Sequence, residues 1–296
     1  MNLVEQIVDD HNLCGEGPLW DWRQNRLIWN DLSASLVFEY CPESGSRTII
    51  NRGLMAAGMA LNDDGGLVLA GSTGIHVWRG QSQCRTVISE YQNRLLQCND
   101  ILADSRGRLY VGTMYWHEST MVRPGELYLI DNDGSPQIVD EGISLANGLG
   151  LSPDGGTLYF ADSAQHSIYA YDVDIANGTL SHKRVFVEVP KSEGLPDGLV
   201  VDADGFVWCA LWYGGQVVRY DPDGRIERCI TLPASQVTSL EFGGPALTDL
   251  YVTSAAEPWP NNLLPHYDSR SGNLGGALYR IQLDIAGNRR HLARIG

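Results

Sequence analysis

The 296-residue chain has few cysteines, few basic residues and no long apolar run. Its six cysteines include no CxxC pair, so we expect reduced thiols and no zinc–thiolate centre. Lysine and arginine number 21 against 36 acidic residues, and the formal net charge of −15 opposes binding to nucleic acid or anionic lipid. The longest uncharged apolar stretch, residues 54–61, is too short to span a membrane, and no basic segment followed by an apolar core opens the chain. We therefore expect a cytoplasmic protein without a membrane partner.

Several familiar motifs are also missing. The seven histidines show no HExxH or other tight ligand spacing, and no GxSxG sequence provides a nucleophilic serine. No long apolar stripe of helical period separates the β-rich runs, which argues against alternating strands and helices. No Pro-, Ser- or charge-rich run marks a linker, so residues 1–296 are expected to form a single domain.

The chain does contain a repeating unit with one residue at a fixed phase. In four units this residue is polar and stands five positions before an Asp or Ser that starts a turn, after which a β-rich strand follows. Successive phase positions are 41 to 50 residues apart, which is the period of propeller blades. The six positions are Glu16, Ala57, Asn99, Asn147, Asp197 and Thr238. The sequence therefore predicts an all-β fold, a six-bladed β-propeller.

A propeller must join its two chain ends to close the ring. The opening LVEQIV has the pattern of a strand, and no segment before it completes a blade. We expect it to pair into the last sheet beside ALYRIQLD at 277 and HLARIG at 291, which would remove exposed strand edges.

The innermost strand of every blade lines the central channel, so equivalent positions form a ring around the axis. Four of the six positions offer oxygen atoms: Glu16 and Asp197 as carboxylates, Asn99 and Asn147 as carboxamides. Two buried carboxylates repel each other unless a cation lies between them. Oxygen ligands of this charge suit calcium, magnesium or manganese, while zinc is less usual without His or Cys. The pattern predicts a divalent metal site in the channel.

Glycine follows three of the four oxygen-bearing residues. Gly17, Gly148 and Gly198 would permit tight backbone approach or unusual dihedral angles beside the channel. In the remaining unit Asp100 takes the place of glycine and adds a carboxylate.

Each of these residues also has a plainer interpretation. Asp-Gly and Asn-Gly are common turn dipeptides, so Asn147 or Asp197 alone would indicate a hairpin. The shared phase favours the functional interpretation. Asp154, Asp204 and Asp223 lie in similar turns at another phase and are interpreted as structural.

Five stretches closely resemble the family of gluconolactonase, regucalcin (senescence marker protein) and luciferin-regenerating enzyme. They are LCGEGPLWD, CNDILADSRGRLYVGTM, NGLGLSPDGGTLYFADS, LPDGLVVDADGFVWCALWYGGQVVRYDPDG and FGGPALTDLYVTSA, and the resemblance runs from about residue 12 to 285. It implies a six-bladed propeller that binds one divalent metal ion in its channel and hydrolyses sugar lactones. It also implies that the metal ligands are Glu16 of GEGP, Asn147 of NG and Asp197 of PDG.

The resemblance implies further contacts to substrate. Asn99, from the family's ND pair, would touch metal-bound water or substrate. Gln97 stands where animal members similar to regucalcin carry an arginine for substrate hydroxyls, and a neutral amide cannot replace the guanidinium fork. The expected substrate contacts are Gln97, Asn99, Asp100, Tyr115 and Trp212.

Aromatic residues follow two of the predicted inner strands. Tyr115, Trp116 and His117 follow the third strand, and Trp212 and Tyr213 follow the fifth. They could cover a sugar, although aromatic residues in such places commonly pack in the core. The long loop at residues 255–273 is expected to act as a lid or to be a mobile loop.

The implied reaction is hydrolysis of a sugar lactone to an aldonate in carbohydrate catabolism. The metal would polarise the carbonyl, Asp197 would move the proton, and Asn99 would orient water or a hydroxyl. These two residues form the expected catalytic pair. Two alternatives stay open: hydrolysis of another ester, such as an aryl lactone or phosphotriester, and a non-catalytic calcium-binding regulatory propeller. The sequence does not indicate an oligomeric state.

Overall fold

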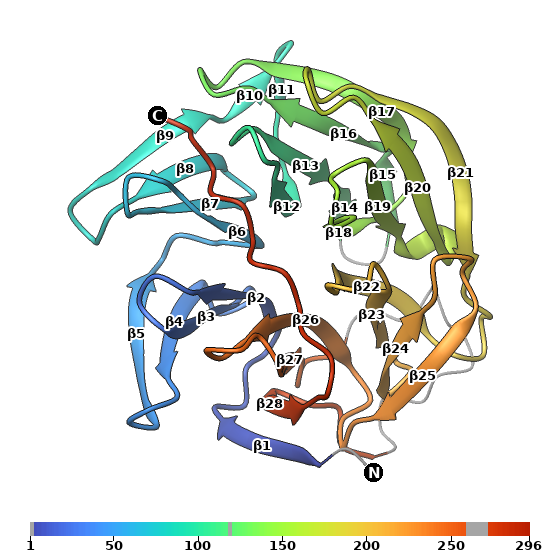
Figure 1. Cartoon of the computed structure of the whole chain (residues 1–296). Coiled ribbons are helices and arrows are strands. Elements are labelled where there is room, and N and C mark those ends of the chain that lie inside the picture. The colour runs from blue at the N-terminus through green and yellow to red at the C-terminus, as the bar shows by residue number, and fades with distance from the viewer. Residues whose placement is uncertain (1–2, 118–119, 259–271) are drawn as a thin grey trace.

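The structure, a computed structural model, describes residues 3–117, 120–258 and 272–296. In these ranges the strands form six four-stranded antiparallel sheets and two small hairpins. Figure 1 shows the sheets arranged as blades around one axis, with the innermost strands facing the centre. This arrangement confirms the predicted six-bladed propeller. No helix in the same ranges has the length and apolar character needed to cross a membrane.

The strands of each blade follow one another from the channel outward. Blades 1 and 2 are β2 (Gly15–Asp21), β3 (Arg26–Asp31), β4 (Leu36–Cys41), β5 (Ser46–Arg52), and β6 (Gly58–Leu61), β7 (Leu67–Gly71), β8 (Gly74–Trp78), β9 (Cys84–Ile88). Blades 3 and 4 are β12 (Cys98–Ala103), β13 (Leu109–Thr113), β16 (Gly125–Ile130), β17 (Pro136–Ile143), and β18 (Ala146–Leu151), β19 (Thr157–Asp162), β20 (Ser167–Val173), β21 (Leu180–Glu188). Blades 5 and 6 are β22 (Leu195–Val201), β23 (Val207–Trp212), β24 (Gln216–Tyr220), β25 (Ile226–Thr231), and β26 (Val237–Gly243), β27 (Asp249–Ser254), β28 (Ala277–Gln282), β1 (Val4–Asp9).

Three short elements lie between the blade strands. They are the hairpin of β10 (Glu90–Tyr91) and β11 (Arg94–Leu95), the hairpin of β14 (Tyr115–His117) and β15 (Thr120–Arg123), and the 3-10 helix η1 (Ser163–Gln165).

Large apolar side chains fill the spaces between neighbouring blades. Trp208 of blade 5 packs edge-on against Phe242 of blade 6, with ring centroids 6.0 Å apart, and both are almost completely buried. Trp20 of blade 1 stacks on Tyr251 of blade 6 across the closing interface. Burial of such surfaces between blades explains why the units are stable as a ring rather than alone.

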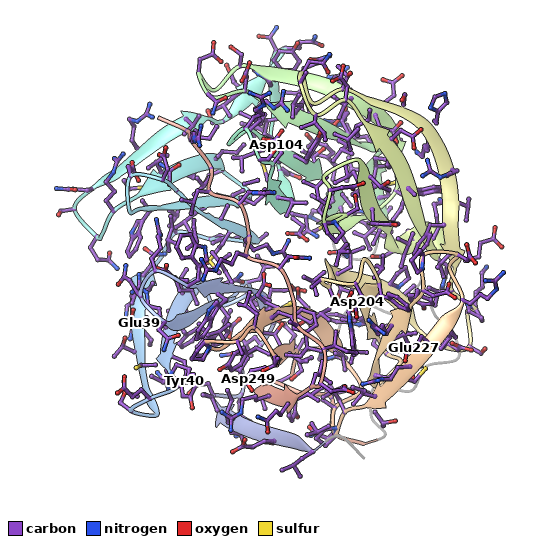
Figure 2. All side chains as sticks on the ribbon, in the orientation of Figure 1. Glu39, Tyr40, Asp104, Asp204, Glu227 and Asp249 are labelled. Carbon is purple, nitrogen blue, oxygen red and sulfur yellow. The ribbon has the colours of Figure 1, made fainter. Side chains whose placement is uncertain are left out.

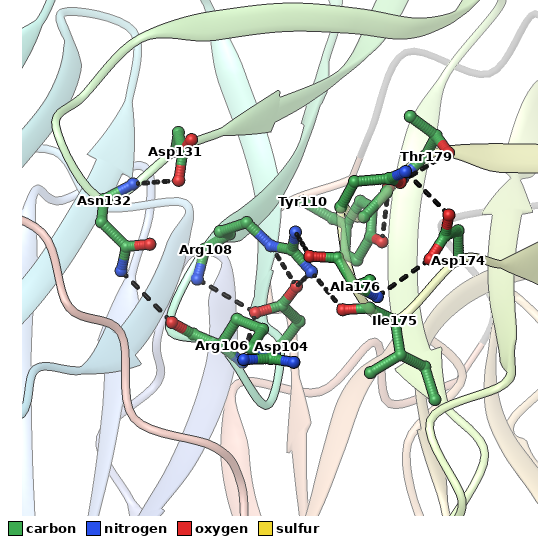
Figure 3. A network of polar contacts seen from close by, with 12 residues as sticks. Asp104, Arg106, Arg108, Tyr110, Asp131, Asn132, Asp174, Ile175, Ala176 and Thr179 are labelled. Atoms are coloured by element: carbon green, nitrogen blue, oxygen red, sulfur yellow. Dashed lines mark hydrogen bonds and ion pairs between the residues drawn. The ribbon is translucent and has the colours of Figure 1, made fainter.

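The aspartates that start the turns after the inner strands are structural anchors. Asp104 accepts hydrogen bonds from the backbone of its own turn and from Nε of Arg108 at 2.7 Å. Arg108 then reaches the carbonyl oxygens of Ile175 and Ala176 in blade 4, as Figure 3 shows. Blade 5 repeats the device, because buried Asp202 accepts from the guanidinium of Arg219 at 2.8 Å. These two Asp–Arg pairs hold the turns in place. They do not include the residues predicted to face the channel.

The two ends of the chain meet in blade 6. Strand β1 pairs antiparallel with β28, with Val4 opposite Ile281 and Asp9 opposite Ala277. The blade therefore takes its outermost strand from the start of the chain and its other three from the end.

Residues 291–296 do not follow the expectation that HLARIG pairs into this last sheet. Because β1 already occupies the outer edge of blade 6, these residues run on across the ring. Ala293 forms a bridge with Asn62 after β6, and the backbone N–H of Arg294 donates to Gly107 in blade 3 at 2.9 Å. In Figure 1 the red chain leaves β28 and crosses the middle of the propeller toward β9. We call residues 283–296 the C-terminal segment.

Candidate metal and active site

Five of the six innermost strands carry a β-bulge at or directly beside the residue that holds the fixed phase of the sequence repeat. In β12, β18, β22 and β26 the register shifts around the phase residue itself, and in β2 it shifts directly after Glu16. A bulge adds one residue to a strand and redirects the local side chains. The bulges occur at Glu16, Asn99, Asn147, Asp197 and Thr238. They give the phase positions a common backbone geometry at the channel wall.

The glycines beside these residues allow neighbouring strands to approach closely. A Cβ atom on Gly148 would lie 2.4 Å from the backbone nitrogen of Leu199, and one on Gly198 would lie 2.1 Å from Oγ of Ser239. Gly17 instead has a φ of +51°, in the left-handed region that favours glycine. The predicted need for glycine at these positions is confirmed, by contact at two and by backbone conformation at the third.

One cavity at the channel mouth brings together the four oxygen-bearing phase residues. Glu16, Asn99, Asn147 and Asp197 come from blades 1, 3, 4 and 5, and all of them line it. Nδ2 of Asn99 donates to Oδ1 of Asn147 at 2.8 Å. The remaining lining residues are Cys14, Leu32, Met114, Leu145, Ser163, Leu195 and Trp212. The cavity thus has a polar cluster within a largely apolar wall.

Both carboxyl groups of the cavity lie in surroundings that disfavour their charged forms. Burial raises the pKa of Asp197 well above its ordinary value, and repulsion from Glu16 and Asp100 raises it further. Burial and the charge of Asp100 raise the pKa of Glu16 to about 8, although the N–H of Gly17 partly stabilises the carboxylate. Within the described ranges no lysine or arginine forms an ion pair with either carboxyl group. At neutral pH the pair needs a proton or a cation.

This donor set fits a hard divalent cation. Two carboxylates and the carboxamide oxygen of Asn147 supply only oxygen ligands, which calcium, magnesium and manganese prefer. Among the residues that the structure describes, no group of three or more His, Cys, Asp or Glu side chains is placed to hold a metal ion. A metal site in this cavity would therefore depend on asparagine oxygen as well as on carboxylates.

Asp100 faces a second chamber, deeper in the channel. It lines a cavity with Glu241 and Arg290, while the mouth cavity does not include it. Burial raises the pKa of Asp100, and the charge of Arg290 opposes that shift. Arg290 belongs to the C-terminal segment, and its Nε donates to Oε2 of Glu241 at 2.5 Å. Asp100 is thus placed to act on the mouth cavity by its charge rather than by contact with a ligand there.

The predicted substrate contacts separate into two groups. Trp212 lines the mouth cavity and packs edge-on against Tyr213, with ring centroids 5.7 Å apart. Tyr115 and Gln97 are not among the described residues of the cavity wall. Tyr115 donates its hydroxyl hydrogen to the carbonyl of Leu95 at 3.0 Å, and Arg123 lies over its ring. Of the loop predicted as a lid, residues 259–271 lie outside the described part of the chain.

Sequence reasoning missed most of the apolar wall. Cys14, Leu145 and Leu195 each stand two residues before a phase residue, and all three line the mouth cavity. Alternation along a strand would have placed them on the channel side. Burial raises the pKa of the Cys14 thiol well above its ordinary value, and Glu16 and Asp197 add to that shift. Cys14 therefore contributes an uncharged thiol to the wall.

The fold and the cavity define a class of protein, six-bladed propellers with an oxygen-rich channel mouth. Residues 14–256 match the family described as SMP-30/Gluconolactonase/LRE-like region. The chain belongs to this family, which confirms the resemblance noted in the sequence.

Similar proteins include enzymes and a calcium-binding protein. The pentonolactonase XacC of Haloferax volcanii is 34% identical over 284 residues, which cover 96% of each chain. A solved structure of luciferin-regenerating enzyme is 25% identical, covers 100% of both chains and has a TM-score of 0.88. A calcium-binding protein, regucalcin, from Agrobacterium tumefaciens is 26% identical, covers 99% of this chain and 98% of its own, and has a TM-score of 0.87.

Proposed function

We propose that the protein hydrolyses sugar lactones to aldonates with a divalent metal ion held at the channel mouth. The observation that carries this proposal is the meeting of Glu16, Asn99, Asn147 and Asp197 in one cavity, where the surroundings raise the pKa of both carboxyl groups. The similarity to a pentonolactonase over nearly the whole chain supports lactones as the substrate class. We assign the product to carbohydrate catabolism.

Glu16, Asn147 and Asp197 would hold the metal ion. When bound, a divalent cation supplies a Lewis acid that polarises the lactone carbonyl and stabilises negative charge as water adds. The similarity to a calcium-binding regucalcin supports calcium as one candidate, and magnesium, manganese and zinc remain to be compared.

Asp197 is the proposed general base. Its carboxylate would accept a proton from the attacking water and then return it to the ring oxygen as the ester bond breaks. The new C–O bond comes from water, and the leaving ring oxygen becomes the free hydroxyl of the aldonate. Asp197 is 5% exposed, and in the metal-free protein its burial raises the pKa of the carboxyl group.

Asn99 is the proposed orienting residue. Its Nδ2 is already used by the carbonyl of Ala146 at 2.7 Å and by Asn147 at 2.8 Å. Its Oδ1 accepts no hydrogen bond from the described residues and lies on a side chain that lines the cavity. This oxygen can therefore accept from the attacking water or from a sugar hydroxyl, which would fix the direction of attack.

The wall of the cavity suits a small polyol with one hydrophobic face. Leu32, Leu145, Leu195 and Trp212 give apolar surface in the same cavity as the polar phase residues. Trp212 is thus proposed to cover the sugar ring. Gln97 and Tyr115 would contact substrate only if it extended beyond this cavity.

Two alternative functions would use the same cavity. The calcium-binding relative makes a non-catalytic calcium-binding propeller the main alternative. A third possibility is another ester, such as an aryl lactone or phosphotriester, because the proposed base and metal ligands do not by themselves select a sugar.

The test is a pH-indicator assay of purified protein with five- and six-membered aldonolactones. We expect ring opening that stops after chelation and returns with one of calcium, magnesium, manganese or zinc. Aryl lactones and a phosphotriester run in parallel would identify the third possibility. Metal binding without hydrolysis of any ester would favour the calcium-binding alternative and contradict the enzymatic proposal.

A further inference from the structure

A chain of hydrogen bonds runs along the mouth cavity from blade 3 to blade 5. Asn99 donates to Asn147, and Nδ2 of Asn147 donates to Oγ of Ser163 at 2.8 Å. Ser163 donates in turn to the carbonyl oxygen of Pro196 at 2.5 Å. Ser163 begins η1, directly after β19, and it is 2% exposed. Pro196 is the residue before Asp197, so this chain connects two proposed metal ligands.

The blade 3 end of the chain determines which atom of Asn147 faces Asn99. The carbonyl oxygen of Ala146 can only accept, and it lies 2.7 Å from the amide nitrogen of Asn99. The Asn99 carboxamide must therefore turn its NH₂ group toward this side. The Asn147 atom beside that NH₂ group has to be an acceptor, which is Oδ1.

The blade 5 end acts on the other atom of the same carboxamide. A serine hydroxyl has one hydrogen, and Ser163 gives it to Pro196, whose carbonyl oxygen can only accept. Oγ of Ser163 can then only accept from Asn147, so the atom facing it must be Nδ2. A reversed carboxamide would set NH₂ against NH₂ at Asn99 and oxygen against oxygen at Ser163.

We propose that Ser163 is a positioning residue that holds the Asn147 carboxamide with Oδ1 available to the metal ion. The inference rests on the proposed metal site. Asn147 has one oxygen, and the opposite orientation would offer the cation an NH₂ group, which is not a ligand. Asp197 and Glu16 have two equivalent oxygens each and need no such control. Partners that orient a metal ligand typically change metal affinity about 10- to 100-fold when removed.

The test is a double-mutant cycle between Ser163 and Asn147, read by calorimetric titration of the whole protein with calcium, manganese and zinc separately. Ser163→Ala should weaken binding of the best metal at least about tenfold. Asn147→Asp presents an oxygen in either orientation. In that background, Ser163→Ala should change the dissociation constant less than about threefold.

Ser167→Ala is the matched control, because Ser167 is also buried in blade 4 and donates to the carbonyl oxygen of Gln165 at 3.1 Å. It should leave metal affinity unchanged. Thermal melting of every variant without metal shows whether the fold is retained.

The possible outcomes separate this inference from the proposed function. Equal metal affinity of wild type and Ser163→Ala would overturn the role of Ser163 while leaving the metal site intact. The same loss in the Asn147→Asp background would also overturn it, since the effect would then not depend on carboxamide orientation. Absence of metal binding by the wild-type protein would overturn the metal site and this inference together.

Discussion

Asn99 and Asn147, 48 residues apart in the chain, are joined inside the channel by a hydrogen bond from Nδ2 to Oδ1 of 2.8 Å. The contact connects blade 3 to blade 4 and places a residue proposed to orient water beside a residue proposed to bind metal. Since Asn99 touches a proposed ligand without being one, the two functions can be separated by mutation.

Asn99→Ala should retain metal but lose most of the hydrolytic rate. The substitution removes the oxygen proposed to orient water and one contact to Asn147, while Ser163 still holds the Asn147 carboxamide through its Nδ2. We expect kcat to fall about 10²-fold, as for loss of one positioned polar group in other active sites. Calorimetry with the activating metal should show a dissociation constant within about fivefold of wild type. A loss of metal binding as large as the loss of rate would contradict this division of roles.

Asp197→Asn should abolish most turnover in a folded protein. The change keeps the shape of the side chain and one oxygen but removes the base, so kcat should fall about 10²- to 10⁴-fold. Asp204→Asn is a matched control, because Asp204 lies in the following turn of the same blade and pairs with Arg219 rather than with the channel. Figure 2 labels Asp204 on blade 5. Full activity of Asp197→Asn, or equal losses in the two variants, would argue against Asp197 as the base.

The raised pKa values predict a specific pH dependence of stability without metal. The pKa of Glu16 rises from an ordinary value of 4.5 to about 8 in the folded protein, and that of Asp197 also rises. Above pH 4.5 and up to about pH 8, the folded state therefore binds more protons than the unfolded state. The free energy of unfolding should fall as pH rises through this window.

Melting curves in chelator, from about pH 6 to about pH 9, measure this effect. Tm should decrease with pH, and Glu16→Gln should flatten the decrease. Saturating metal should raise Tm most at the alkaline end, where both carboxylates are charged. A Tm in chelator that rises across the same interval would show that the carboxyl pair is not destabilised by its surroundings.

Arg290→Leu should destabilise the protein strongly, although Arg290 lies near the chain terminus. Glu241, with a side chain only 1% exposed, pairs with Arg290 and would lose its ion-pair partner. Breaking a buried pair from one side costs about 3–5 kcal/mol. Denaturant unfolding should show this loss in the single variant and substantial recovery in Arg290→Leu/Glu241→Leu.

An exposed arginine provides the comparison. Arg225, whose side chain is 73% exposed, pairs with Asp223 at the surface, so Arg225→Leu should change stability by less than about 1 kcal/mol. If Arg290→Leu changed stability by no more than this, Arg290 of the C-terminal segment would not compensate the charge of Glu241 in the second chamber.

The sequence repeat predicted both the fold and the position of the site, because its period and its phase answer different questions. The spacing from Glu16 to Thr238 indicated the number of blades, and the shared phase indicated the convergence of Glu16, Asn99, Asn147 and Asp197. Both follow from rotational equivalence, which needs no knowledge of local contacts.

The remaining features depend on contacts that no repeat specifies. The second chamber around Asp100 is formed with Arg290 of the C-terminal segment, which crosses the ring after blade 6 is completed by β1. The proposed role of Ser163 depends on its single hydroxyl hydrogen, which it donates to the carbonyl oxygen of Pro196. Such local geometry cannot be read from residue types and spacing alone.

The metal site at the channel mouth can be located by the anomalous difference density of a crystal soaked in manganese, measured at a wavelength where manganese scatters anomalously. We expect one strong peak in the mouth cavity, within coordinating distance of Glu16, Asn147 and Asp197, and we expect it to disappear in Asp197→Ala. A map without a peak among these three side chains, from crystals of protein whose lactonase activity manganese supports, would contradict the proposed metal site.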